Sequence, residues 1–183
     1  MTDEKIAGKK ILLKPNWVLH NQKAKDEICM RTHDSFLLAT LEILLEMNPS
    51  EIVLGDAPVQ GCQWDQMIKP EFIKKVQQLS EKIKVPVLIK DFRRVSYNSE
   101  TNQLEKNRNA IDDFIIFDVG KKSYLEEISD DSRSPFRVTN YDPGRLTESH
   151  RKGVHKYCIT KELFNADVVI TVPKIKTDRK SVV

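Results

Sequence analysis

The chain has 183 residues, 39% of them hydrophobic and 31% charged, and its 30 basic and 27 acidic residues give a net charge of +3. A chain of this length and composition buries a real core as a soluble globular protein, with one domain as the default. The balanced charge argues against a nucleic-acid partner, and no apolar run approaches the 18 residues that a membrane span needs.

The first half of the chain alternates short apolar runs with longer amphipathic segments. In chain order, the pattern predicts a strand over 10–14, a helix over 33–47 that Thr32 caps, a strand in EIVLGDAP (51–58) that ends in Gly55, a helix over 70–83 and a strand over 85–91. The strands are continuous apolar runs, which is typical of strands covered on both faces. The alternation therefore predicts an α/β fold, with a mostly parallel sheet and helices on both faces in a Rossmann-like, three-layer arrangement.

The second half of the chain begins with a polar stretch, residues 92–155, which we interpret as an insertion in a single domain over 1–183. Within it, RRVSY (93–97) and DFIIFDV (113–119) are candidates for an antiparallel pair. ITKELFNA (159–166) then predicts one or two helical turns, and DVVITV (167–172) predicts a last core strand.

The cysteines and the N-terminus bear on the cellular compartment. Cys29, Cys62 and Cys158 are far apart and form no C-x-x-C pair, so the sequence predicts free thiols and no metal site, and it leaves any cofactor unknown. The N-terminal MTDEKIAGKK lacks the apolar region of a signal peptide. We therefore expect a cytoplasmic protein.

Polar side chains follow the predicted parallel strands at the points where those strands end. In open parallel sheets, ligands bind outside the carboxyl ends of the strands, so these side chains should share one edge. Lysines at that edge favour a carboxylate or phosphate ligand, and the aspartate can orient a hydroxyl, a lysine or a metal. The residues at the exits are Lys14 and Asn16, then Asp56, and finally Lys174, Lys176 and Thr177.

Thr32 and His33 open the first predicted helix on the same edge. A helix N-terminus attracts anions through its free N–H groups, and its dipole disfavours a charged imidazole, so His33 should be neutral more often than a free histidine. We expect Asp56, His33 and Lys174 to be catalytic, with Asp56 or His33 as acid or base and a desolvated lysine as base or nucleophile. The expected substrate-binding residues are Lys14, Asn16, Thr32, Lys176 and Thr177.

Plainer interpretations stand beside these. Strand ends are often simply polar, a Gly-Asp pair after a strand is a common turn, and His33 suits a helix cap. The basic run over 145–156, with His150 and His155, is either a solvated loop or a flap over the pocket. Since GxGxxG, a Walker loop and GxSxG are all absent from the sequence, it supports no standard nucleotide site or hydrolase elbow.

Four segments in order, KKILLKPNWV, a helix opened by TH, EIVLGDAP and ADVVITVPKIKT, resemble the family called domain of unknown function 362. Asp178 departs from that family's pattern, which has histidine after KT. The resemblance implies an N-terminal part of a longer protein and allows redox or cofactor-linked chemistry; some relatives carry ferredoxin-like iron–sulfur domains. A weaker similarity connects the chain with nickel-dependent lactate racemases, whose cofactor-holding lysine would lie beyond Val183.

Three functional hypotheses follow. The first is an enzyme domain that acts on a small anionic substrate at the strand exits. The second is a binding or scaffold module that uses the same pocket without catalysis, or the 120–156 segment for a protein partner. The third is half of a site, completed by a missing C-terminal region or by a homo-oligomer, which predicts an exposed apolar patch along the last strand.

Overall fold

The computed structural model describes residues 5–20, 30–98, 100–101, 103–106, 113–129 and 146–174. The chain divides into two compact units, residues 1–107 with 162–183, and residues 108–161 inserted between them. Among the described residues, no helix has the length and apolar character that crossing a membrane requires.

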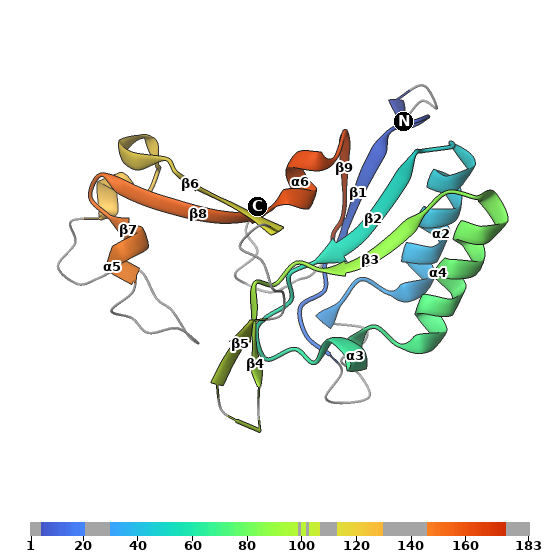
Figure 1. Cartoon of the computed structure of the whole chain (residues 1–183), viewed down its shortest axis with the longest axis horizontal. Coiled ribbons are helices and arrows are strands. Elements are labelled where there is room, and N and C mark those ends of the chain that lie inside the picture. The colour runs from blue at the N-terminus through green and yellow to red at the C-terminus, as the bar shows by residue number, and fades with distance from the viewer. Residues whose placement is uncertain are drawn as a thin grey trace. The chain divides into compact units, whose positions relative to one another are not determined.

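The first unit is built on a four-stranded parallel sheet with the order β3-β2-β1-β9 (Figure 1). β1 is the central strand, and it pairs in parallel with β2, which places Leu12 beside Val53, and with β9, which places Leu12 beside Val169. This sheet, flanked by helices, confirms the predicted α/β class. Its elements are β1 (Lys10–Pro15), α2 (Asp34–Glu46), β2 (Glu51–Asp56), α3 (Trp64–Met67), α4 (Pro70–Ile83), β3 (Val87–Asp91), α6 (Lys161–Asn165) and β9 (Val168–Val172).

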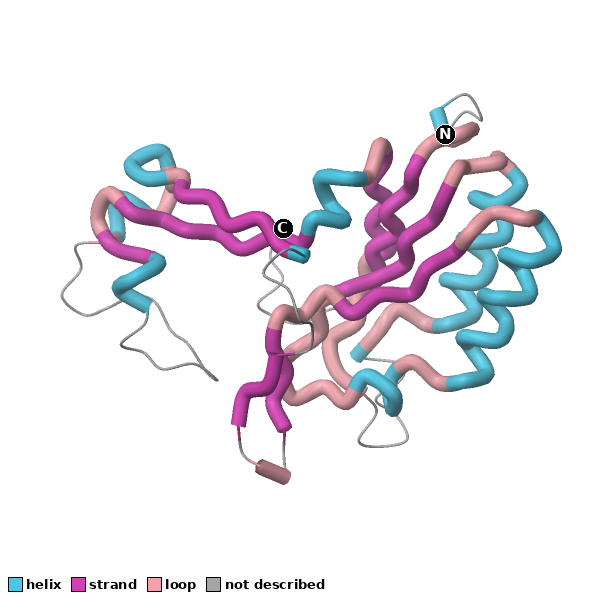
Figure 2. The backbone as a smooth tube through the Cα atoms, viewed as in Figure 1, coloured by secondary structure: helices cyan, strands magenta, loops and turns pink. Residues whose placement is uncertain are grey.

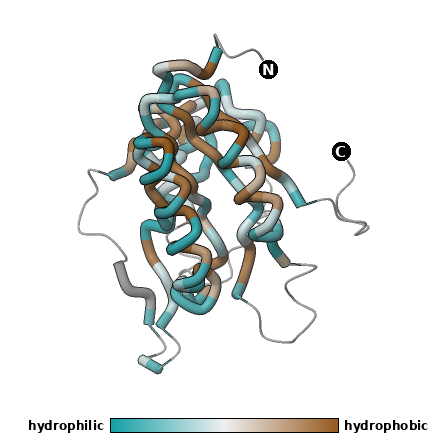
Figure 3. Tube along the Cα trace, turned by 90° about the vertical axis from the view of Figure 1, so that its right-hand side faces the viewer, coloured by the Kyte–Doolittle hydropathy of each residue, from teal (hydrophilic) through white to brown (hydrophobic). Residues whose placement is uncertain are grey.

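Helices α2 and α4 lie side by side along one face of the sheet, as Figure 2 shows, and Figure 3 shows hydrophobic and hydrophilic residues alternating along both. Their apolar faces and the sheet enclose the main core. Pro70 begins α4, as its missing N–H predicts. The residues of this core with at most 1% exposure include Leu13, Trp17, Leu37, Leu41, Leu45, Ile52, Leu54, Met67 and Val76.

The other face of the sheet is covered more sparsely. Leu12, Val53 and Phe92 form a small buried cluster there, and Ala166, just after α6, packs against it. Glu162 of α6 also reaches this side, where it pairs with Lys90 of β3. Leu88 and Val169 stay 40% and 42% exposed, so part of this face is open to solvent in the described structure.

The antiparallel pairing predicted between RRVSY and DFIIFDV is wrong. Instead, β4 (Val95–Asn98) forms a local hairpin with β5 (Gln103–Lys106). A hairpin with a short connection closes at a smaller entropic cost than a pairing across the longer Asn-rich segment.

The second unit contains the strand that pairs with DFIIFDV in place of RRVSY. β6 (Phe114–Asp118) pairs with β8 (Val154–Thr160), and β8 pairs in turn with β7 (His150–Arg151), all antiparallel. The described part of the basic run 145–156 is therefore a hairpin preceded by a helical turn, and not an open loop. The other elements of this unit are the 3₁₀ turns η3 (Gly120–Lys122) and η4 (Glu126–Ile128) and the short helix α5 (Leu146–Ser149).

Candidate ligand site at the strand exits

An ion pair joins the exits of β1 and β2. Lys14 Nζ lies 2.8 Å from Asp56 Oδ1, because the parallel register brings the ends of these neighbouring strands together. The Asp56 side chain is 9% exposed, whereas the Lys14 side chain is 47% exposed. The pair therefore has one buried, fixed partner and one partner that reaches solvent.

The carboxylate of Asp56 is held by backbone groups as well. Its Oδ2 accepts the N–H of Trp17 at 2.8 Å, and its Oδ1 accepts the N–H of Ala57 at 2.8 Å. With the ammonium of Lys14, three donors fix the position of this side chain. If Asp56 were to accept a proton in a reaction, that proton would compete with these three donors for the carboxylate oxygens.

Thr32 connects the exits of β1 and β9 with the start of α2. Its hydroxyl donates to the carbonyl of Val172 at 2.8 Å and accepts the N–H of Asn16 at 3.0 Å. Its own N–H donates to the carbonyl of Asn16 at 2.9 Å. Thr32 is 3% exposed, so its hydroxyl serves to position the three segments around the site.

The side-chain amide of Asn16 takes no part in these contacts. Its Nδ2 is buried and has no hydrogen-bond partner among the described residues. A buried donor without an acceptor costs about 1–3 kcal/mol, so such groups in folded proteins ordinarily have a function or an unseen partner. An oxygen atom of a bound ligand would satisfy this amide.

His33, not Thr32, is the N-cap of α2. Its Nδ1 accepts the N–H of Ser35 at 3.2 Å and lies 2.8 Å from the Ser35 hydroxyl. The ring is exposed, and with Nδ1 accepting, the proton of the neutral imidazole is on Nε2. Asp34 already places a negative charge in the first turn, where it pairs with Arg31. The helix N-terminus therefore attracts an external anion less strongly than the sequence predicts.

The structure brings four of the predicted site residues together: Lys14, Asn16, Thr32 and Asp56. Lys174 follows Val172 by two residues and is half-buried. His33 lies at the neighbouring helix start. The predicted ligand residues Lys176 and Thr177, and Asp178 with them, lie outside the described residues.

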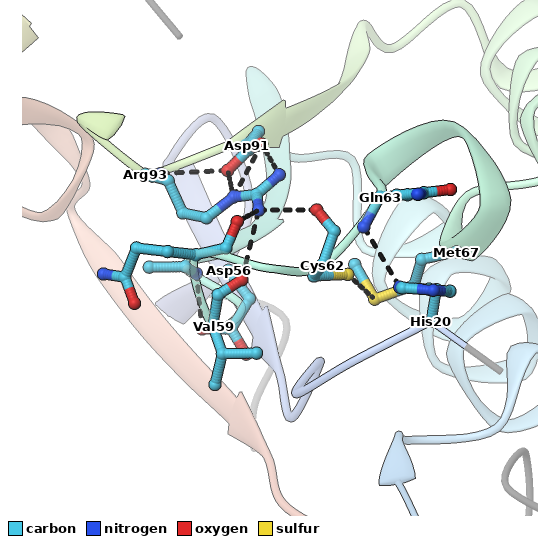
Figure 4. Close-up of polar contacts among 10 residues, drawn as sticks. His20, Asp56, Val59, Cys62, Gln63, Met67, Asp91 and Arg93 are labelled. Atoms are coloured by element: carbon cyan, nitrogen blue, oxygen red, sulfur yellow. Dashed lines mark hydrogen bonds and ion pairs between the residues drawn. The ribbon is translucent and has the colours of Figure 1, made fainter. Parts of the chain in front are cut away.

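The loop after β2 is anchored by Arg93, which the sequence interpretation missed (Figure 4). The guanidinium forms a two-pronged contact with Asp91, with distances of 2.7 and 3.1 Å, and NH1 donates to the carbonyls of Val59, Gln60 and Cys62 at 3.1, 3.2 and 2.7 Å. Backbone carbonyl acceptors leave no pattern in a sequence, so no signal there could have identified this role.

Two further contacts hold the loop and its ends. Nδ1 of His20 accepts the N–H of Gln63 at 3.1 Å, and the rings of Trp17 and Trp64 meet edge to face with centroids 5.6 Å apart. Burial raises the pKa of the Cys62 thiol, and the nearby Arg93 charge opposes that rise only in part. Cys62 is therefore a packing residue and a poor nucleophile.

Within the part of the chain that the structure describes, no group of three or more histidine, cysteine, aspartate or glutamate side chains could hold a metal ion. Comparisons of the chain with models of known protein families, with curated proteins and with solved structures find no match. The resemblance to domain of unknown function 362 thus rests on its four motifs and stays a prediction.

Proposed function

We propose that the strand-exit edge of the first unit binds a small anionic ligand, a carboxylate or a phosphate, and is part of an enzyme acting on it. The observation that carries the proposal is the buried Nδ2 of Asn16, which has no partner among the described residues and lies beside the Lys14–Asp56 pair in the chain. Both Asn16 Nδ2 and Lys14 Nζ are donors, so together they favour a ligand rich in acceptor oxygens.

The burial of the ion pair supports this role for Lys14. Asp56 and its backbone donors hold one end of the pair, while the half-exposed lysine also donates to the carbonyl of Pro15 at 3.3 Å, which leaves one of its N–H donors for a ligand. An ammonium group has three N–H donors, so Lys14 can contact Asp56 and a ligand oxygen at once. Lys174, two residues beyond the Val172 carbonyl that Thr32 binds, would add a second positive charge.

For catalysis, the lysine is the better proton carrier of the pair. Lys14 would donate a proton to a ligand oxygen that becomes negative, and Asp56 would keep the ammonium aimed at that atom. His33 would act only through Nε2, because its Nδ1 already accepts a hydrogen bond in the helix cap.

A non-catalytic binding module is the second candidate, and the contacts of Asp56 favour it. Both carboxylate oxygens already accept hydrogen bonds from backbone N–H groups, which is how a structural carboxylate is held. A binder needs only the charges, whereas catalysis needs an acid or base within reach of the bound ligand.

The third hypothesis, half of a site, draws support from β9. This strand lies at the edge of the sheet in the described structure, and Val169 in it is 42% exposed. Leu163 and Phe164 of α6 are 40% and 53% exposed. A further segment or a second copy of the chain beside β9 would cover such residues.

The binding proposal is tested by titrating inorganic phosphate and, separately, citrate into the protein and following amide chemical shifts by NMR. We expect Lys14→Met and Asn16→Asp each to weaken binding about tenfold or more, a loss of about 1.4 kcal/mol, because each removes a donor. Lys74→Met, an exposed lysine of α4, is the matched control and should leave binding unchanged.

Thermal melting of each variant separates a lost ligand contact from a damaged fold. Melting temperatures close to that of the parent protein, together with weaker binding, support the site. Equal affinity in the parent and in both site variants would remove the proposal.

A further inference from the structure

β9 forms one edge of the parallel sheet, and no other described strand pairs with its outer side. An edge strand presents unpaired backbone N–H and C=O groups, which folded proteins usually protect with charged side chains, a proline or a bulge. The other edge strand, β3, carries Lys90 and Asp91. β9 has the sequence VVITV, which contains neither a charged residue nor a proline. The β9 edge of the described structure is therefore unprotected, and its β-branched residues favour pairing with a further strand.

Apolar side chains lie beside this edge on the face of the sheet that α2 covers. Phe36 and Ile43 are 59% and 56% exposed, and they stand two turns apart on one side of α2. Leu38 and Glu42 line the groove between α2 and α4, so Phe36 and Ile43 lie on the side of α2 that faces away from α4. Because α4 leads into β3, that side of α2 is the one nearer to β9.

The opposite face of the sheet also has exposed apolar residues at this edge. Val169 of β9 stands in one row with Leu12 and Val53, and it is exposed whereas they are buried. Phe164 of α6, which leads into β9, is 53% exposed. A strand added beside β9 would place a side chain next to Val169 and remove apolar surface from water on both faces.

The two ends of β9 carry opposite charges. Asp167 precedes the strand, where its Oδ2 accepts the N–H of Lys10 at 2.8 Å and its own N–H donates to the carbonyl of Lys10 at 2.9 Å. Lys174 follows the strand by two residues. When two such strands pair antiparallel, the acidic end of one meets the basic end of the other, whereas a parallel pair would bring like charges together. The charges of this edge are therefore complementary to those of a second copy related by a two-fold axis.

We propose that two copies of this chain pair antiparallel through β9, which joins their four-stranded sheets into one continuous sheet. With the two-fold axis at Ile170, Val169 lies opposite Thr171 of the partner subunit, and β-branched residues face each other along the strand. Asp167 then lies near Lys174 of the partner subunit. The second copy is the neighbour of β9 that the third functional hypothesis requires, and the dimer does not depend on ligand binding at the strand exits.

The test is the mass of the full chain in solution without ligand, measured by sedimentation equilibrium at about 1 to 100 μM, since assembly depends on concentration. We expect a particle with twice the mass of the single chain. The double variant Val169→Lys/Thr171→Lys places like charges opposite each other at two positions of the dimer, so its dissociation constant should rise about tenfold or more.

Two further variants show whether the register is correct. Val169→Lys/Thr171→Glu places opposite charges at the same two positions, so its dimer should be clearly tighter than that of the variant with two lysines. Leu88→Lys is the matched control, because Leu88 is 40% exposed on the same face of the sheet but at the β3 edge. Its dissociation constant should equal that of the parent chain.

A parent chain that stays monomeric over this concentration range overturns the proposal. Equal dissociation constants in the parent chain and in the variant with two lysines would exclude pairing through β9, and equal weakening in both double variants would exclude this register. Circular dichroism checks the fold of each variant. If the variant with two lysines does not fold, Val169→Glu/Thr171→Glu takes its place with the same expected weakening. Phosphate titration of the same samples reports on the ligand site, so the failure of either proposal is seen separately.

Discussion

At Gly55 the sheet has no room for a side chain. A Cβ atom there would lie 2.5 Å from the carbonyl oxygen of Lys90 and 2.5 Å from Cζ of Phe92, both far inside van der Waals contact. The ring of Phe92 occupies this space because it packs with Leu12 and Val53 over the sparsely covered face. In the Gly-Asp pair at the end of β2, Gly55 is therefore needed for packing, and Asp56 forms the ion pair with Lys14.

We expect Gly55→Ala to lower the free energy of unfolding by about 1–3 kcal/mol, the usual cost of overpacking a core. Urea denaturation measures the change. Gly61→Ala is the matched control, since a Cβ at Gly61 meets nothing within 4 Å and the change should be small. Adding Phe92→Ala to Gly55→Ala should not restore full stability, because the clash with the backbone carbonyl remains. Equal losses of unfolding free energy in Gly55→Ala and Gly61→Ala would contradict this prediction.

At the scale of elements, the loop between β2 and α3 depends on a residue from beyond β3. Arg93 is 5% exposed and its guanidinium holds three carbonyls of this loop together with the Asp91 carboxylate. Removing one partner of a buried ion pair typically costs about 3–5 kcal/mol, because the other charge is left unpaired. We expect a loss of that size in Arg93→Met, measured by urea unfolding.

The neighbouring Arg94 provides the control for this prediction. Arg94 is exposed, so Arg94→Met keeps the change of side chain but leaves the loop contacts in place. Its unfolding free energy should stay within about 0.5 kcal/mol of the parent value. If the two variants lose stability to the same extent, the guanidinium of Arg93 is not what anchors the loop.

The elements that the sequence predicts well are those with a continuous apolar run or a clear helical periodicity. β1, β2, β3 and β9 and the helices α2 and α4 are all visible in this way, and the parallel order then brings Lys14 to Asp56. β8 was missed because His155 and Lys156 interrupt its apolar residues where it leaves the basic run, and because its pairing with β6 joins distant segments. The pairing register of strands that are far apart in the sequence has no local sequence signature. The same holds for the backbone carbonyls that Arg93 contacts.

At the scale of the whole molecule, the buried core is distributed unevenly. All residues of the two hydrophobic clusters belong to the first unit, whereas Phe114 is the large apolar side chain that the described second unit buries. The second unit relies instead on polar contacts, above all those in which Asp118 and Glu126 accept backbone N–H groups. The stability of the second unit should therefore depend strongly on the charge of these two carboxylates, whereas the stability of the first unit should depend on it little.

This difference predicts that acid unfolds the second unit first. Because accepted backbone hydrogen bonds lower the pKa of Asp118 from 3.8 and that of Glu126 from 4.5, their stabilising effect is complete above those values and disappears as the pH falls through the lower, folded ones. Hydrogen exchange followed by mass spectrometry should show peptides from 113–129 and 150–160 losing protection as the pH falls below 4.5, while peptides from β1 and α2 keep it. Asp118→Asn, which cannot ionise, should start from weaker protection at neutral pH and show a smaller acid response. Simultaneous loss of protection in both units would contradict the prediction, since it would mean that a single core controls the acid stability of the chain.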